Sequence, residues 1–322
     1  MIAETLAQEI MKRRERELTS KSRVYRQTCP RASSINLDCA REMYYQITAW
    51  DKKPIPEPYL MARFEEGHEQ ERKVNRMLLD LGFDIAEGQR DFELKDPITG
   101  QVLCTGHIDG RIPWPVKDEN GEERTVRVPY EVKSLDPNVY AMINTVEDFN
   151  RYDWSKKYPL QIQIYLHFTG EQEGIFILTD CKGHIKIIPV RRDEELQNQI
   201  FDQCAFVTGC VEQKKEPEFC NDANKCRKCW AFGRVCTPPI NVESALIIDD
   251  PEIEVKLEQR EKLKDSAKEY ESLDKEVKGY FRGKEIAICG DFMITGKAGK
   301  MNLKAREASV TETWTTKIEK TV

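Results

Sequence analysis

The segment GHIDG at residues 106–110, followed by EVK at 131–133, decides the expected fold. The EVK tripeptide lies near the end of an apolar run typical of a β-strand, and strand residues two apart share a face. Glu131 and Lys133 therefore point the same way, while Val132 points into the core. If Asp109 ends the neighbouring strand, two carboxylates and the Val132 carbonyl can hold a divalent cation, with Lys133 beside an attacked phosphate. These groups are the ones that phosphodiester hydrolysis needs.

A helix is expected over residues 60–81, in which one carboxylate interrupts the apolar face. At ~100° per residue, Glu71 falls in the middle of that stripe. A buried, unpaired carboxylate is costly, so Glu71 needs a cation, a basic partner or a raised pKa. A metal shared with Asp109 and Glu131 meets this need, and an internal salt bridge or an exposed helix end is the alternative. The stripe is formed by Phe64, Val74, Leu78 and Leu81.

A second helix, largely buried, is expected near residues 156–168. Gln161 and Tyr165 are four residues apart and so share one edge of it. Such polar tips can orient a catalytic lysine, a metal-bound water or a DNA phosphate. They can equally be hydrogen-bonded core residues.

These motifs, in this order, resemble the RecB-like branch of the PD-(D/E)XK nucleases. The resemblance implies a restriction-endonuclease-like α/β core, with a central mixed β-sheet flanked by helices. It implies Mg²⁺ or Mn²⁺ bound by Glu71, Asp109, Glu131 and the Val132 carbonyl. It also makes Lys133 the catalytic lysine and adds Gln161 and Tyr165 as the helical motif. His68 is the less favoured occupant of the first position, because it lies only one residue past Gly67.

Eleven cysteines are many for a chain whose N-terminus is a charged amphipathic segment rather than a secretory signal. No apolar run approaches ~18 residues, so no membrane span is expected. In a reducing compartment, clustered cysteines more often bind metal than form disulfides. Four of them lie close together, among basic residues that favour thiolates, and the local sequence alone suggests a zinc site. These four are Cys220, Cys226, Cys229 and Cys236.

The segment around Cys39 adds another possibility. Residues 33–45 resemble the Ser-x-Leu-x2-Cys-x-Arg opening of iron-sulfur RecB-like nucleases, including the CRISPR-associated and AddB-type members. In those families one early and three late cysteines hold a [4Fe-4S] cluster. The resemblance implies Cys39, Cys226, Cys229 and Cys236 as ligands, with Cys220 as an alternative. The last spacer, of six residues, is longer than the usual form.

The net charge of -6 gives no general support for nucleic-acid binding, but the local charge differs. Residues 12–31 carry eight basic side chains against two acidic ones. This basic arm is either a phosphate-contacting segment or an exposed helix face.

Four regions are expected: a helical lead-in with the basic arm and Cys39 (1–58), the nuclease core (59–213), the cysteine region (214–240) and a C-terminal appendage (241–322). The core should contain strands within 89–135 and at 174–179 and 185–190, and a helix at 194–213. The appendage should contain a charged helix at 251–281 and a small β unit at 285–317. Residues 290–294 faintly resemble the tail of YqaJ-type phage exonucleases.

The expected function is therefore a metal-dependent DNA nuclease. By resemblance, it is an exonuclease that acts on single-stranded DNA ends in recombination, repair or phage DNA processing, with endonuclease activity as an additional possibility. The resemblance also implies a recombination or CRISPR-type protein partner and no membrane. The expected setting is the cytoplasm of a bacterial or phage-infected cell. Two alternatives remain: a catalytically silent nuclease-fold protein that binds DNA or acts as a scaffold, and a zinc-finger-type adaptor. The adaptor explains the cysteines but not the three acids.

Overall fold

The computed structural model describes residues 2–117, 120–220, 222–239, 251–289 and 292–295. The chain divides into two compact units, Met1–Leu257 and Glu258–Val322. All the candidate site residues belong to the first unit.

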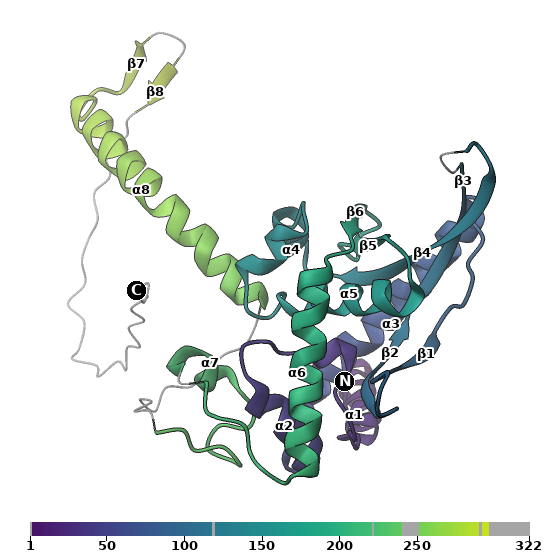
Figure 1. Cartoon of the computed structure of the whole chain (residues 1–322). Coiled ribbons are helices and arrows are strands. Elements are labelled where there is room, and N and C mark those ends of the chain that lie inside the picture. Colours follow the sequence, from purple (N-terminus) through teal and green to yellow (C-terminus); the bar gives the residue numbers. More distant parts are fainter. Residues whose placement is uncertain (1, 118–119, 221, 240–250, 290–291, 296–322) are drawn as a thin grey trace. The chain divides into compact units, whose positions relative to one another are not determined.

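A mixed four-stranded sheet, in the order β3-β4-β5-β6, lies in the first unit (Figure 1). β3 pairs antiparallel with β4, β4 parallel with β5, and β5 antiparallel with β6. The parallel pair requires a crossover, which here contains α4, η3 and α5. The predicted mixed sheet flanked by helices is confirmed. The bounds are β3 (Gly110–Lys117), β4 (Glu123–Ser134), α4 (Pro137–Met142), η3 (Glu147–Arg151), α5 (Lys157–Thr169), β5 (Glu173–Thr179) and β6 (Ile185–Arg191).

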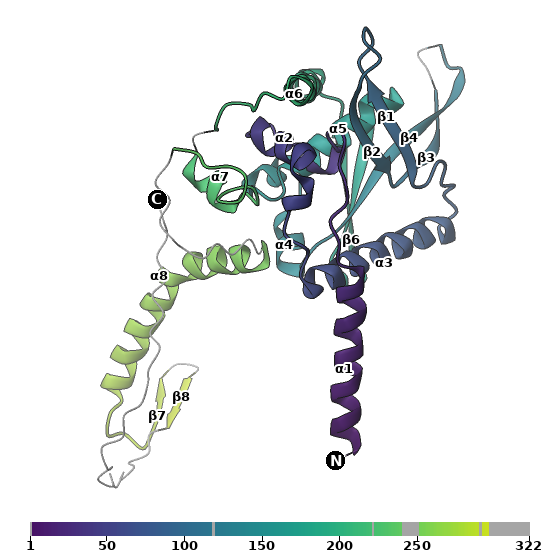
Figure 2. The ribbon, with the colours of Figure 1, turned by 90° about the horizontal axis from the view of Figure 1, so that it is seen from below.

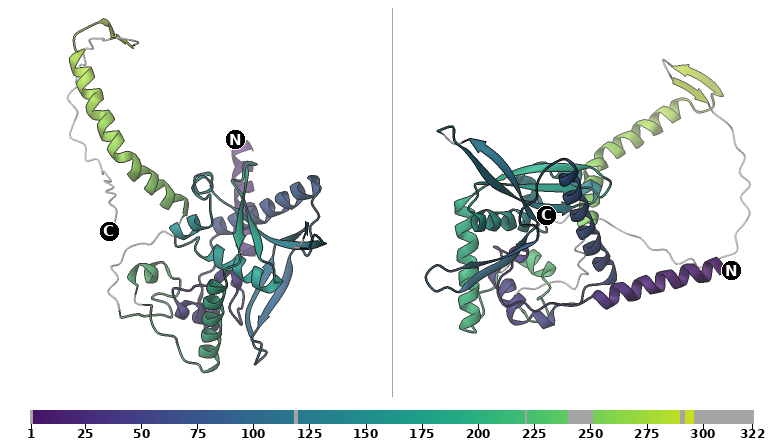
Figure 3. Two further views of the ribbon diagram at one scale, coloured as in Figure 1. Left: turned by 45° about the horizontal axis from the view of Figure 1, so that its top comes forward. Right: turned by 90° about the vertical axis from the view of Figure 1, so that its right-hand side faces the viewer.

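α3 (Pro58–Asp80) and α5 cover opposite faces of this sheet (Figures 2 and 3). On one face, Tyr130 and Val132 belong to the same core cluster as Val74 of α3. On the other, Phe176 of β5 packs in a cluster with residues of α5. Because side chains alternate along a strand, Glu131 and Lys133 lie on the α5 face of β4.

A two-stranded antiparallel ribbon, β1 with β2, lies beside the main sheet and shares a core with α2, α5 and α6. Phe92 of β1 contacts the Tyr165 ring edge-on, at 5.7 Å between centroids. The ribbon and its helices thus enclose the α5 face where Glu131 lies. The bounds are α2 (Ala40–Thr48), β1 (Arg90–Lys95), β2 (Val102–Ile108) and α6 (Glu194–Glu212).

The N-terminal region is helical, as expected, and α1 (Ile2–Lys21) carries the first part of the basic arm. Arg14 and Lys21 are both paired with Glu65 of α3, at 2.5 and 2.6 Å. With Arg13, which is paired with Glu9 at 2.8 Å, at least three of the eight basic groups are therefore already in ion pairs within the fold. The remaining short helices are η1 (Ala32–Ser34), η2 (Trp50–Lys52) and α7 (Ala223–Lys228).

The predicted apolar stripe of α3 is wrong at both of its ends. Val74 and Leu78 are 3% and 4% exposed, whereas Phe64 and Leu81 are 49% and 64% exposed. Only the middle of the helix packs on the sheet: Phe64 lies nearer its start, and Leu81 is already the residue that caps it. Glu71 nevertheless lies on the covered side, with its side chain 17% exposed.

The charged helix and the β pair predicted for the C-terminal region are present over the described residues. α8 (Pro251–Tyr280) leads to the hairpin of β7 (Ile286–Cys289) and β8 (Phe292–Thr295). The rest of the predicted β unit, residues 296–317, lies outside the described residues, as do Gly290 and Asp291. In the part of the chain that is described, no helix is long and apolar enough to cross a membrane.

Candidate active site

Asp109 is the residue between β2 and β3, where the chain passes from the ribbon to the main sheet. The following glycine makes this junction possible, because a Cβ on Gly110 would come within 2.6 Å of the Tyr130 ring. Tyr130 is fixed in turn, since its hydroxyl donates to Asn75 Oδ1 of α3 at 2.8 Å. Only glycine allows β3 to begin so close to this ring.

The Asp109 carboxylate is hydrogen-bonded to the middle residue of the EVK tripeptide. The Val132 N–H donates to Asp109 Oδ2 at 2.8 Å. In a strand, the N–H and C=O of one residue face the same neighbour, so the Val132 carbonyl also faces the Asp109 side. The structure therefore brings together the first acid and the backbone oxygen that the sequence suggested as ligands.

Glu131 and Lys133 form a buried ion pair on the α5 face. Lys133 Nζ contacts Glu131 Oε1 and donates to Gln161 Oε1 at 3.3 Å. The Gln161 amide donates to the Tyr165 hydroxyl, which completes a chain of polar groups from β4 to α5. Gln161 and Tyr165 are thus buried and hydrogen-bonded, and their chain reaches the lysine.

Glu71 approaches Asp109 from α3, and its charge contributes to the raised pKa of Asp109. Its Oε1 accepts a hydrogen bond from the side chain of Gln89. His68, the alternative first ligand, lies one turn earlier, with Nδ1 3.9 Å from Glu71 Oε2 and its side chain 72% exposed.

The acids and the lysine perturb one another's ionisation. Burial raises the pKa of Asp109 well above its usual value, and the Glu131 carboxylate raises it further. Burial lowers the pKa of Lys133 and is the largest single influence, but Glu131, Tyr158 and Asp109 together outweigh it, so the net shift is upward. Lys133 is therefore a cation at neutral pH. Burial, together with the fields of Glu131 and Asp109, raises the pKa of Tyr165, which stays protonated.

Two contacts of this site were not anticipated from the sequence. The Lys133 ammonium lies over the Tyr158 ring at 4.6 Å from its centroid. Gln89 holds Glu71 from the connection between α3 and β1. Tyr158 belongs to the expected helix and could have been noticed as one turn before Gln161. Gln89 belongs to no recognisable motif.

The residue types present suit a divalent cation. Glu131 and Asp109 act on the single ammonium group of Lys133, and Glu71 acts on Asp109, so the acidic groups outnumber the basic one. Glu131 is 3% exposed, and its Oε2 is a buried acceptor with no hydrogen bond of good geometry from the described residues, although the Tyr165 hydroxyl lies near enough for Glu131 to raise its pKa. An uncompensated buried carboxylate oxygen is costly, and a cation ligated by oxygen atoms would compensate it.

The cysteine region brings its thiols together at one cavity. Cys220 Sγ lies 3.6 Å from Cys226 Sγ, and Cys220 is close enough to Cys39 to raise the pKa of that thiol. Cys236 is close enough to act electrostatically on Cys226 and Cys229. Burial raises the pKa of Cys39, Cys226 and Cys229 to about 12, so these thiols are protonated unless a metal replaces their protons.

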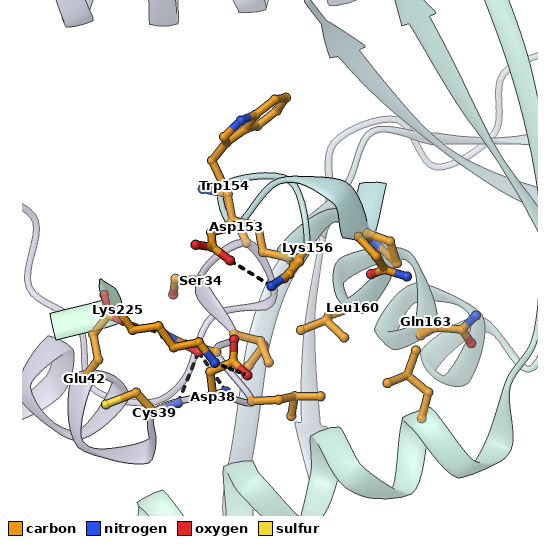
Figure 4. A pocket seen from close by; sticks show the side chains of 18 of the residues that line it. Ser34, Asp38, Cys39, Glu42, Asp153, Trp154, Lys156, Leu160, Gln163 and Lys225 are labelled. Atoms are coloured by element: carbon orange, nitrogen blue, oxygen red, sulfur yellow. Dashed lines mark hydrogen bonds and ion pairs between the residues drawn. The ribbon is translucent and has the colours of Figure 1, made fainter. Parts of the chain in front are cut away.

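All five cysteines line a cavity of about 1380 Å³, part of which is seen in Figure 4. The acids of the candidate site do not line it, so the large cavity and the acid site are distinct places. Two ion pairs lie in its wall, one between Lys225 and Asp38 and one between Lys156 and Asp153. Among the described residues, no group of three or more His, Cys, Asp or Glu side chains is already arranged to hold a metal ion, and this applies to the three acids as well as to the cysteines.

No family model matches the sequence, and no curated protein matches it. The fold is similar to the crystal structure of SSO0001, with a TM-score of 0.39 and 16% identity over 75% of this chain and 98% of that one. It is also similar to LHK-Exo in complex with dAMP, with a TM-score of 0.39 and 17% identity over 58% and 89%. A further similarity is to the alkaline exonuclease LHK-Exo from Laribacter hongkongensis, with a TM-score of 0.32 and 18% identity over 47% and 69%. These TM-scores are too low to place the chain in a fold family, so its function is inferred from the site itself.

Proposed function

We propose that this protein is a divalent-cation-dependent DNA nuclease of the PD-(D/E)XK type, acting as an exonuclease on single-stranded DNA ends. One observation carries the proposal. The Asp109 carboxylate accepts a hydrogen bond from the Val132 N–H, and Glu131, the residue before Val132, is paired with Lys133. A structural ion pair needs one carboxylate. This site has three, and one of their buried oxygens is unsatisfied.

The cation is expected to be Mg²⁺ or Mn²⁺, held by Glu71, Asp109, Glu131 and the Val132 carbonyl. When bound, it would supply a lowered pKa for an attacking water and stabilisation of charge on the phosphate. Aspartate and glutamate oxygens, together with a backbone carbonyl, form the hard ligand set that these ions prefer.

Lys133 is proposed to stabilise negative charge on the phosphate during attack. It is a cation in the folded protein, so it cannot accept a proton from water in this state. A preorganised ammonium beside the developing charge lowers the barrier without any reorganisation. Gln161 and the Tyr158 ring fix its position from α5.

The test is cleavage of end-labelled single-stranded DNA by anaerobically purified protein, with Mg²⁺ or Mn²⁺ and with EDTA. Cleavage that needs the cation and is lost in Lys133→Ala supports the nuclease, and the product ladder gives its polarity. Tight binding of the DNA by intact protein without cleavage would instead support the DNA-binding scaffold.

We further propose that the cysteine region binds a [4Fe-4S] cluster through Cys39, Cys226, Cys229 and Cys236. The thiols are gathered from both ends of the first unit, and α2, which follows Cys39, packs with α6 in one core. Cys220 is the alternative ligand, and its contacts with Cys39 and Cys226 favour it over a purely bystander role. Four ligands would leave one of these five thiols outside the cluster.

Metal content and absorption of the purified protein test this assignment. A brown protein absorbing near 400 nm, with about four iron atoms per chain, supports the cluster. A colourless protein with stoichiometric zinc would replace it by the zinc site that the local sequence suggests.

A further inference from the structure

The connection between α3 and β1, which can be followed in Figure 2, contains two residues with an unusual backbone conformation. Glu87 and Gln89 both have positive φ angles, 54° and 55°, although neither is glycine. Positive φ is disfavoured for residues with a side chain, and glutamine is not among the types that tolerate it best. Among the described residues, only two other non-glycine positions, Cys181 and Lys214, share this conformation. Two of the four therefore lie next to the acid site.

This connection is tied firmly to the strand that follows Asp109. Ala86 and Arg111 exchange two backbone hydrogen bonds, of 2.8 and 2.9 Å. The Glu87 carboxylate accepts a further bond from Arg111 Nη1 at 3.0 Å, and Arg111 is 8% exposed. The position of Gln89 relative to β3 is thus fixed from the preceding residues.

Gln89 then contacts two of the three acid-bearing segments. Its backbone N–H donates to the Asp109 carbonyl oxygen at 3.3 Å. Its side-chain amide donates to Glu71 Oε1. One residue in a strained conformation therefore links α3 to the junction between β2 and β3.

We propose that Gln89 is a positioning residue for the cation site, which holds Glu71 in the orientation needed to share a cation with Asp109. This inference rests on the proposed nuclease function. An amide suits the task because it donates to one carboxylate oxygen without cancelling the charge. A lysine or arginine at this position would neutralise Glu71 and compete with the cation. The strain is consistent with a side chain needed where glycine would fit the backbone better.

The test is Gln89→Gly, which removes the amide and relieves the backbone strain together. Removal of a hydrogen bond that orients a metal ligand typically weakens metal binding ~10- to 100-fold. We therefore expect the Mn²⁺ affinity of Gln89→Gly, measured by calorimetry, to fall by about tenfold. The melting temperature of the metal-free variant should be unchanged or raised, because strain is lost. A residue with only a structural role would not lower cation affinity while preserving stability.

Lys214→Gly is the matched control, because Lys214 has a φ of 53° on an exposed residue after α6. It should relieve the same strain and leave Mn²⁺ affinity unchanged. In cleavage assays, Gln89→Gly should need more Mn²⁺ for half-maximal rate but reach a near wild-type rate at saturation. Wild-type affinity in Gln89→Gly would overturn the role of Gln89 alone. Absence of Mn²⁺ binding to the wild type would overturn the proposed function first.

Discussion

Some buried side-chain nitrogen and oxygen atoms of the described residues have no hydrogen-bond partner. At the acid site this atom is an acceptor, Glu131 Oε2, whereas all the others are N–H donors. Three of these donors belong to residues that line the cysteine cavity, and two belong to neighbours of Cys226 and Cys229 in the sequence. An unsatisfied acceptor favours a cation, and unsatisfied donors favour an anionic or sulfur-rich group. The two regions of the unit are thus suited to opposite kinds of ligand. The donors are on Arg41, Trp154, Arg192, Arg227 and Trp230.

The largest expected effect separates chemistry from folding at the acid site. Asp109→Ala and Glu131→Ala should each lower cleavage by about a thousandfold, because either change removes a cation ligand. Asp109→Ala should leave the fold intact, since it relieves repulsion between carboxylates. Circular dichroism and cleavage rates, measured on the same preparation, check this. Insoluble Asp109→Ala protein would instead assign that carboxylate a structural role.

The cysteine region should respond in the opposite way, with stability rather than chemistry affected. Cys226→Ser should lose metal and lower the melting temperature by ~10 °C, because a ligand bound tightly to the folded state contributes ~4 kcal/mol at a thousandfold excess over its Kd. Cleavage per folded molecule should change much less. Cys220→Ser distinguishes the two ligand sets: full metal content in that variant favours the set without Cys220, and loss of metal makes Cys220 a ligand.

The sequence predicted the residues of the acid site better than it predicted the contacts that hold them or the cavity that the cysteines share. The alternation along β4 placed Glu131 and Lys133 on one face without any knowledge of their partners, since strand period alone decides it. Helical period placed Glu71 on the covered side of α3, but it did not show where the sheet ends, so Phe64 was misplaced. Gln89 could not be predicted, because its role depends on a positive φ and on contacts made across the fold. The shared cavity depends on packing between segments almost 200 residues apart in the sequence, Cys39 and Cys236.

A smaller effect tests which α3 residue serves the acid site. Glu71→Gln should weaken Mn²⁺ binding by about tenfold, because the amide keeps the shape of the side chain but not its charge. His68→Ala should leave Mn²⁺ affinity unchanged, since its side chain is 72% exposed and its Nδ1 lies 3.9 Å from Glu71 Oε2. Calorimetric titration of both variants with Mn²⁺ checks this. The reverse pattern would move the ligand role to His68.

The smallest expected effect is a pH dependence confined to the metal-free acid site. The pKa of Asp109 is raised by burial and by Glu131, so folding favours its protonated form. The wild type should therefore lose stability relative to Asp109→Asn as the pH rises from about 4, the unfolded pKa, through the higher folded value. A difference of about 1 kcal/mol corresponds to ~2–4 °C in melting temperature for a chain of this size. Mg²⁺ should reverse the order of the two proteins at neutral pH, because only the wild type has the full set of ligands. A pH-independent difference would mean that folding does not shift the pKa of Asp109, and the argument that the acid site needs a cation would lose its electrostatic support.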